Sequence, residues 1–301
     1  MKSLVICVGV VSLALLPVLA AQEPAPAKIL IAFSSYRERP RHSNLFFYEH
    51  DGVSSGKIVG SVGTPRSDNA AGHPALTQDG RYCFFTFEVE NQVSRIQCWD
   101  RNEKKLLELG TINDSPSALL GPSVSGDGNL VALAGWNRPG SSAGGGAGSG
   151  YHVFLFDRSA KKFLDLPGLN SQGFDDRMPA LSGDGRFIGF VSNRKGGEGL
   201  TDLYLYDRKE TKLIPVAGLN TKHTELEPSL NADGNLIAFA SEREGGEGGR
   251  DIYLFDRAAG EHGAGEADHV RSELGAGKVD RVAGEHGVAE AGPPHRRTER
   301  R

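Results

Sequence analysis

Short apolar runs separated by turns of Gly, Asp and charged residues follow one another along this chain. The clearest group is PALSGDGRFIGFVSNRKGGEGLTDLYLYDR, from Pro179 to Arg208. Within it, PALS predicts a first strand, and RFIGFVS predicts a second, nearly continuous apolar strand that is buried on both faces. DLYLYD, rich in aromatic residues, predicts a third strand, and KLIPV, from Lys212, predicts a weaker fourth. The body of the chain has no apolar period of about 3.6 residues, so we expect few helices.

This group of strands is repeated along the chain. PSLNADGNLIAFASEREGGEGGRDIYLFDR, from Pro228 to Arg257, is a close copy, and looser copies begin at Pro74 and Pro122. A half-copy, ILIAFSSYRERP followed by NLFFYEHDG, begins at Ile29 with a second strand and lacks a first. Internal repeats of this length are typical of arrays and β-propellers.

The Asp-Gly turn between the first and second predicted strands gives the repeat length. The successive turn residues Asp79, Asp127, Asp184 and Asp233 are 48, 57 and 49 residues apart. The longest interval contains the flexible run GSSAGGGAGSG, so the underlying unit has about 48 residues. Four antiparallel strands in a unit of this length form one propeller blade.

The pattern P-x-L-S-x-D-G, then I-A-F-x-S-x-R, then D-I-Y-L-Y-D resembles the TolB-type, WD-like β-propeller repeat, over roughly Ile29 to Arg257. The resemblance implies an all-β fold, a β-propeller of four-stranded antiparallel blades in which the first strand is innermost. It also implies a ring of six blades. Five units are visible here, the first without its first strand and the last without its fourth, so an open or truncated arc of five blades is the alternative.

The resemblance carries a functional expectation that the fold alone does not. The family includes the periplasmic TolB propeller, which binds partner proteins of the cell envelope, and similar propellers gate serine peptidases. We expect an exported, non-enzymatic, protein-binding scaffold of the cell envelope. The alternatives are a peptidase-gating propeller, which would need an α/β-hydrolase segment, and a polysaccharide-binding propeller. A sugar binder should expose aromatic residues on loops, whereas Trp99 and Trp136 lie in or beside predicted strands.

The first 20 residues read as a secretory signal, with an apolar run from Leu4 to Leu19 and cleavage before Ala21. An uncleaved anchor is the alternative, although Pro17 and the short apolar run argue against a membrane-spanning helix. We therefore expect a periplasmic or secreted protein that has no transmembrane segment after cleavage.

The predicted propeller, 29–257, is flanked by two segments that cannot build a core. Residues 21–28 form a Pro/Ala linker. Residues 258–301 contain no Phe, Tyr, Trp or Ile, and Leu274 is their one Leu. This segment is predicted to be a disordered or out-of-frame tail that adds no fourth strand to the last unit.

Charge and motifs exclude several function classes. The net charge of −4 gives no electrostatic case for nucleic acid. Gly140–Gly144 matches G-x-S-x-G, but it lacks the flanking strand and helix that a nucleophile elbow requires. We therefore expect no enzymatic activity and no cofactor. Metal binding is also not expected, because these histidines are scattered without ligand spacing: His42, His50, His73, His152 and His223.

The Asp-Gly turns differ from the Asp-boxes of sialidases, because in Asp184-Gly185 the two residues are adjacent. Their repetition in every unit predicts a structural role, with each Asp making local hydrogen bonds to the backbone.

Cys83 and Cys98 remain after signal cleavage, on the predicted second and third strands of one unit. They lie at about equal distances from a hairpin loop centred near Glu90 and Asn91, so they are compatible with a disulfide in an oxidising compartment. Two buried thiols are the alternative, because a one-residue change of register would separate them.

Two sets of charged residues are candidates for function. Asp175, Asp176, Glu225 and Glu227 precede the first strands of two units and are predicted to ring one mouth of the channel. Such an acidic funnel would select a cationic segment of a partner protein; a solvated acidic turn is the alternative. The second set is Arg194 with Asp202, repeated as Arg243 with Asp251, which predicts salt bridges across a loop.

Overall fold

The strands fall into five antiparallel sheets, each formed by three or four consecutive strands. In the computed structural model, the described residues are 28–36, 43–51, 56–62, 70–89, 93–114, 118–136, 150–246, 249–260 and 268–269. The predicted signal 1–20, residues 21–27 of the linker, the run Gly140–Gly144, His42 and nearly all of the predicted tail lie outside them. All described strands belong to one unit of the chain, Met1–His269.

Each sheet is one blade of the predicted repeat. Blade 1 contains β1 (Ile29–Ser35), β2 (Asn44–His50) and β3 (Gly56–Val62). Blade 2 contains β4 (Ala71–Leu76), β5 (Tyr82–Val89), β6 (Val93–Asp100) and β7 (Lys105–Leu107). Blade 3 contains β8 (Leu119–Val124), β9 (Leu130–Gly135), β10 (His152–Asp157) and β11 (Lys162–Leu164). Blade 4 contains β12 (Asp176–Leu181), β13 (Phe187–Ser192), β14 (Asp202–Asp207) and β15 (Lys212–Ile214). Blade 5 contains β16 (Glu225–Leu230), β17 (Leu236–Ser241), β18 (Asp251–Asp256) and β19 (Asp268–His269).

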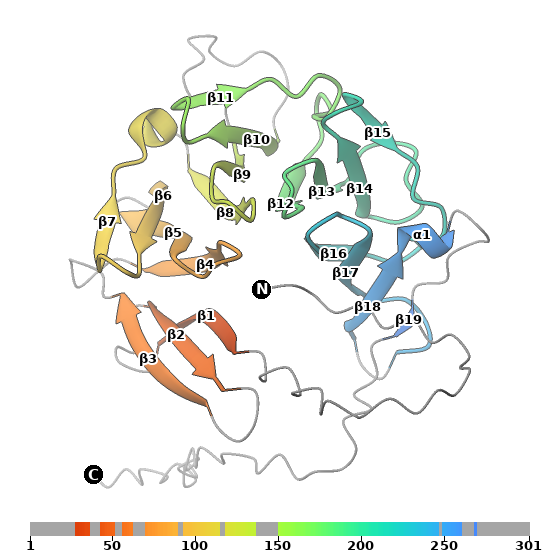
Figure 1. Ribbon diagram of the computed structural model, residues 1–301. Coiled ribbons are helices and arrows are strands. Elements are labelled where there is room, and N and C mark those ends of the chain that lie inside the picture. Colours follow the sequence, from red (N-terminus) through yellow and green to blue (C-terminus); the bar gives the residue numbers. More distant parts are fainter. Residues whose placement is uncertain are drawn as a thin grey trace, which may run out of the picture. The chain divides into compact units, whose positions relative to one another are not determined.

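The five blades follow one another around a ring with their first strands innermost (Figure 1). β4 contacts β8, β8 contacts β12, and β12 contacts β16. The described part of the chain has two short helices, the 3-10 helix η2 (Gly110–Asn113) and the α-helix α1 (Arg257–Gly260). The prediction of an all-β propeller is confirmed, with five blades; the sixth that the resemblance implies is not among the described residues.

Apolar cores lie between neighbouring blades, because alternate residues of a central strand point to opposite faces of its sheet. In β13, Ile188 and Phe190 pack in the core shared with blade 3, whereas Phe187 and Val191 pack in the core shared with blade 5. Both faces of the strand are therefore buried, which explains its nearly continuous apolar sequence.

The Asp-Gly turns make the local hydrogen bonds that their repetition predicts. The Asp184 carboxylate accepts a hydrogen bond from the Ser182 hydroxyl at 2.5 Å and another from the Arg186 backbone N–H at 2.9 Å. Asp127 accepts the equivalent bonds from Ser125 and the Asn129 backbone. The turn is thereby closed by its own side chains.

Successive Asp-Gly turns are also bonded to one another through the backbone. The Gln78 N–H donates to the Gly126 carbonyl at 3.0 Å, and the Gly126 N–H donates to the Gly183 carbonyl at 2.8 Å. Asp184 then donates to Ala232 in the next turn at 2.8 Å. A Cβ added at Gly183 would lie 2.9 Å from the Ala232 Cα, so the close approach of these turns requires glycine there.

An asparagine fixes the connection between blades at three places. The Asn220 side chain accepts a hydrogen bond from the Leu203 N–H and donates one to the Leu203 carbonyl, both at 2.9 Å. Asn170 bonds Val153 in the same way, and Asn113 bonds Ile96. Each asparagine thus satisfies the backbone of a third strand beside the start of the next blade.

Blade 1 has three strands, as the half-copy predicts. β1 occupies the position of a second strand, because it pairs with β2 in the register in which β17 pairs with β18, Phe33 lying opposite Phe46 and Phe239 opposite Tyr253. Its contact with β4 of the next blade repeats the contact of β9 with β12.

The prediction that the tail adds no fourth strand to blade 5 is wrong. Asp268 and His269 pair with Leu254 and Tyr253 of β18, which makes β19 a two-residue fourth strand. The prediction weighed only apolar side chains, whereas a short outer strand is held by backbone hydrogen bonds, which any sequence can supply.

Cys83 and Cys98 are two buried thiols, one of the two arrangements compatible with the sequence, because the register of β5 and β6 separates them. Phe84 lies opposite Cys98, and Cys83 lies opposite Trp99. Adjacent residues of a strand face opposite sides, so Cys83 packs in the core between blades 1 and 2 and Cys98 in the core between blades 2 and 3. Both are free, fully buried thiols.

Because burial raises the pKa of both thiols to about 12, neither cysteine should react with iodoacetamide in the native protein at pH 8. After denaturation without reductant, peptide mapping should find both alkylated. A sample reduced beforehand is the control and should give the same map. A peptide that contains Cys83 disulfide-linked to Cys98 would contradict the observed register.

Candidate functional site

The four complete innermost strands share one backbone irregularity, at the residue before a proline. The residue pairs are His73-Pro74, Gly121-Pro122, Met178-Pro179 and Glu227-Pro228. At each of them the register with the second strand shifts, as in a β-bulge. The residue before the proline has φ of 50°, 56°, 52° and 54° respectively.

This conformation is strained for three of the four residues. A positive φ brings the Cβ of an L-residue against its own carbonyl, at a cost of roughly 1–2 kcal/mol. A following proline further restricts the backbone to extended conformations. Only Gly121 escapes the first cost, so His73, Met178 and Glu227 are held in place by the surrounding sheet.

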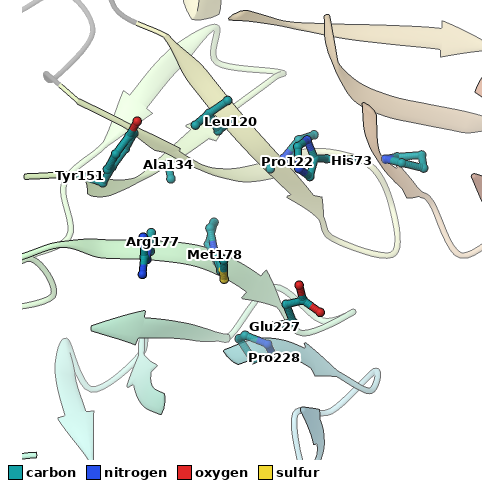
Figure 2. A pocket seen from close by; sticks show the side chains of 12 residues that line it. His73, Leu120, Pro122, Ala134, Tyr151, Arg177, Met178, Glu227 and Pro228 are labelled. Atoms are coloured by element: carbon teal, nitrogen blue, oxygen red, sulfur yellow. The ribbon is translucent and has the colours of Figure 1, made fainter. Parts of the chain in front are cut away.

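The four irregularities line one pocket with a volume of about 460 Å³. The pre-proline residues and their prolines contribute from all four inner strands, and Leu120, Tyr151 and Arg177 complete much of the remaining wall. Figure 2 shows His73, Arg177, Met178 and Glu227 around this space. The pocket is therefore built by four blades together.

The pocket combines an apolar wall with a few polar groups that have no partner in the described part of the chain. Prolines, Leu120 and Met178 supply apolar surface. The Arg177 side chain is half-buried, and neither it nor Glu227 nor His73 makes a hydrogen bond or ion pair with another described residue. A cation and an anion thus remain for a ligand.

Three of the four predicted acidic residues, Asp175, Asp176 and Glu225, accept hydrogen bonds within the framework and do not line the pocket, so the prediction of a four-membered acidic funnel is wrong for them. Asp176 is inaccessible to solvent and accepts hydrogen bonds from the Ser171 N–H and from Arg194, both at 2.6 Å. Asp175 is half-buried and accepts a hydrogen bond from the Tyr151 N–H at 2.9 Å.

Glu225 occupies the position of Asp176 in the next blade, where it too is inaccessible to solvent. Its carboxylate accepts hydrogen bonds from the Thr221 hydroxyl at 2.7 Å and the Ser241 hydroxyl at 3.0 Å, and it pairs with Arg243 at 3.4 Å. Burial raises the pKa of Glu225, against the opposing effect of these partners. Glu227 is the one predicted acidic residue that lines the pocket.

The predicted salt bridges of the arginines are also wrong in their partners. Arg194 pairs with Asp176 and lies over the rings of Phe190 and Tyr204, 5.0 and 4.6 Å from their centres. Arg243 pairs with Glu225 and stacks in the same manner on Phe239 and Tyr253. Asp202 instead accepts hydrogen bonds from the backbone of Glu198 and Gly199, both at 3.1 Å.

Sequence reasoning missed the pre-proline residues. The signal was present, because each inner strand contains the run x-Pro-(Ala or Ser)-(Leu or Val) after a residue that differs between copies. The proline recurs in each of these strands and so marks the repeat, whereas the residue before it varies and does not stand out in the pattern.

Trp136 follows β9, beside a strand as predicted, but its side chain is exposed. Its ring meets the ring of Tyr151 edge-on at 5.3 Å between centres, and Tyr151 lines the pocket. An aromatic pair of the exposed Trp136 and the half-buried Tyr151 therefore adjoins the pocket.

The described residues contain no group of three or more His, Cys, Asp or Glu side chains that could hold a metal ion. None of their helices is long and apolar enough to cross a membrane.

Solved structures similar to this chain agree with the architecture. TolB from Acinetobacter baumannii matches with a TM-score of 0.54 and 18% sequence identity, over 80% of this chain and 52% of that protein. A protein assigned as TolB from Agrobacterium tumefaciens matches with a TM-score of 0.50 and 14% identity, over 80% of each chain. These similarities show a TolB-like β-propeller fold. The tricorn protease, with a TM-score of 0.49, is too distant to support an argument. The sequence matches no protein-family model and no curated protein.

Replacing Asp176 by Asn should lower the free energy of unfolding by about 3 kcal/mol, because it leaves the nearly buried Arg194 without its ion-pair partner. Asp175→Asn is the matched control and should cost less than about 1 kcal/mol, since an amide oxygen still accepts the Tyr151 hydrogen bond. Urea denaturation of both variants measures the difference. Equal effects would mean that Asp176 is not a structural residue.

Gly121→Ala should destabilise the protein by about 1–2 kcal/mol through backbone strain alone, because no atom lies within 4 Å of the added Cβ. Met178→Gly should leave the free energy of unfolding unchanged or raise it by up to about 1 kcal/mol, since it relieves the same strain. Thermal unfolding of both variants tests the pair. A stability loss in Met178→Gly larger than that in Gly121→Ala would show that this residue is not strained.

Proposed function

We propose that this chain is an exported, non-enzymatic β-propeller scaffold that binds a protein partner of the cell envelope in the pocket formed by its inner strands. One observation carries the proposal. The framework of the repeat is kept from blade to blade, yet the strained positions that face the pocket hold four different residues, His73, Gly121, Met178 and Glu227.

In this repeat, a residue type that recurs at one position of successive blades serves the fold, whereas one that varies there is available for recognition. A residue needed for folding recurs from copy to copy, as the Asp-Gly turn does in the four complete copies. A strained residue that differs in each copy stabilises no repeated interaction, and strain of this kind gathers at binding sites. The pocket therefore presents four different residues, each held in place by its own strand of the sheet.

The pocket fits a chain segment that has an apolar side chain and groups of both charges. Met178 and Leu120 would cover the apolar side chain of the segment. Arg177 would pair with its negatively charged group and Glu227 with its positively charged group. This mixed character supports a peptide ligand better than the purely cationic segment expected from an acidic funnel.

A polysaccharide ligand is the second candidate, favoured by the exposed Trp136 beside Tyr151. Aromatic faces stack on sugar rings, and Arg177 would pair with a carboxylated sugar. The peptide remains the first choice because the four strained residues, rather than the aromatic pair, surround the pocket.

A photo-crosslinking amino acid at position 178 tests the proposal in intact cells. The expected result is a discrete protein adduct, reduced at least tenfold by Arg177→Ala or Glu227→Gln. The matched control is the same crosslinker at Leu200, which is 82% exposed and does not line the pocket. An adduct of equal yield from both positions would contradict the proposal. Loss of glycan-array binding in Trp136→Ala, with no protein adduct, would favour the second candidate.

A further inference from the structure

Arg177 occupies a position that the other three complete blades give to an uncharged residue. The residue just before the strained position in blades 2 to 5 is Gly72, Leu120, Arg177 and Leu226. Leu226 is 8% exposed and packs in the core that blades 4 and 5 share. Arg177 is half-buried and lines the pocket. The pocket thus holds a guanidinium at a place where the next blade holds a core leucine.

The neighbouring blade carries a smaller residue at the matching place. The second strand of blade 3, β9, contacts β12. Within it Ala134 is equivalent to Val191 of β13, since each pairs with the second residue of a third strand. Val191 packs with Leu226 in one apolar core, whereas Ala134 lines the pocket with Arg177. The two exchanges together leave a ligand-sized space in place of a core.

The guanidinium of Arg177 has no carboxylate partner among the described residues. Glu227 lines the same pocket but makes no ion pair with Arg177. Asp175 and Asp176, the acids next to it in sequence, accept hydrogen bonds within the framework. A half-buried cation loses hydration without gaining a counter-charge, and a ligand that supplies one removes this cost. The planar fork of an arginine binds a carboxylate through two parallel hydrogen bonds.

Hydrogen bonds between blades 3 and 4 close the pocket next to Arg177. The Asp176 N–H donates to the Tyr151 carbonyl at 2.8 Å, and the Tyr151 N–H donates to the Asp175 carboxylate at 2.9 Å. Figure 2 shows Arg177 on the same side of the pocket as Tyr151, away from Glu227. An extended segment whose carboxylate reaches Arg177 cannot continue between these two blades. This geometry favours the end of a chain over its middle.

We propose that the pocket binds the C-terminal residue of its partner protein, an inference that rests on the proposed function. The terminal carboxylate accepts hydrogen bonds from the Arg177 guanidinium. The last side chain is apolar and packs against Ala134 and Met178. A basic residue upstream pairs with Glu227 on the other side of the pocket. Asp and Glu side chains carry the same acidic group, so the experiments compare the two sources.

A library of random hexapeptides with free C-terminal carboxylates tests the proposal on the full chain. Selection on the immobilised protein should enrich Leu, Ile, Val or Met at the last position. By fluorescence anisotropy an enriched peptide should bind with one peptide per chain, and at least tenfold more weakly when its C-terminus is an amide. Replacing any internal Asp or Glu of that peptide by Asn or Gln should weaken binding less than threefold.

Protein variants locate the carboxylate site. Arg177→Leu gives β12 the residue that β16 has at this position, so the melting temperature should not fall, whereas binding of the free-acid peptide should weaken at least tenfold. Arg177→Lys keeps the charge but loses the fork, and it should recover part of the binding. Arg250→Leu is the matched control, because Arg250 pairs with Glu242 and does not line the pocket, and it should bind as the wild type does.

A further variant tests the place of the last side chain. Ala134→Val introduces the residue that blade 4 has at this position and so narrows the space beside Arg177. Peptides that end in Leu or Met should bind it at least tenfold more weakly than the wild type. Peptides that end in Ala should lose less than threefold.

The photo-crosslinker at position 178 separates this inference from the proposed function. The adduct should contain the C-terminal peptide of the partner, and a glycine extension after the partner's last residue should abolish it. An adduct with an internal peptide, unchanged by the extension, would overturn C-terminal recognition and leave the proposed function standing. Absence of any protein adduct would contradict the proposed function itself.

Two results from the library would also overturn the inference. The first is no enrichment of any peptide on a folded chain. The second is equal binding of the acid and amide forms of the enriched peptides. If those peptides lost binding only when an internal Asp or Glu was replaced, Arg177 would be the receptor of an acidic side chain instead.

Discussion

The structure depends on the apolar cores that neighbouring blades share. A small sheet with two apolar faces cannot exclude water alone, and blades 2, 3 and 4 are each covered by a neighbour on either side. β13 illustrates the constraint, since alternate residues belong to the cores shared with blades 3 and 5. Stability is therefore a property of neighbouring pairs, as in other repeat proteins, and the terminal blades are the ones that lack a covering element.

Within this constraint the hydrogen-bonded framework is repeated while the pocket is not. The Asp-Gly turns, the asparagines at the blade connections and the buried Asp176 and Glu225 each satisfy local backbone or side-chain groups. The polar side chains of these residues are occupied by hydrogen bonds within the fold, so they are not available to bind a ligand. What remains at the pocket is a short series of strained residues together with Arg177, whose side chain has no ion-pair partner among the described residues.

The sequence predicted the parts of the fold that depend on local pattern. Apolar runs and aromatic strands predicted β13 and β14, and repetition predicted the closed Asp184 turn. The register in which two strands pair was harder to predict from the sequence. Val89 pairs with Val93, so three residues separate the two strands. A loop of two residues would place Cys98 opposite Cys83, whereas three residues place it opposite Phe84.

The candidate site was harder to predict for the same physical reason. Arg194 was matched with Asp202, eight residues along the chain, whereas its partner Asp176 begins the strand paired with β13 and is nearer only in space. The positive φ of Met178 has no local sequence signal, because a proline after it favours the opposite backbone region. The positive φ is recognised only from the structure, where the register shifts at the same place in all four inner strands.

The backbone bonds between successive Asp-Gly turns have a consequence for how this chain can change in length. Gln78, Gly126 and Gly183 form a continuous series in which each turn is fixed by the next, so an added residue would break two bonds at once. Insertions are confined to loops outside that series. The one long repeat interval fits this rule, because its extra residues fall between β9 and β10, away from the turns. Residues therefore cannot be inserted in the Asp-Gly turns without loss of backbone hydrogen bonds. The loop between the second and third strands of a blade can be lengthened, and a new recognition loop or an inserted domain can be accommodated there.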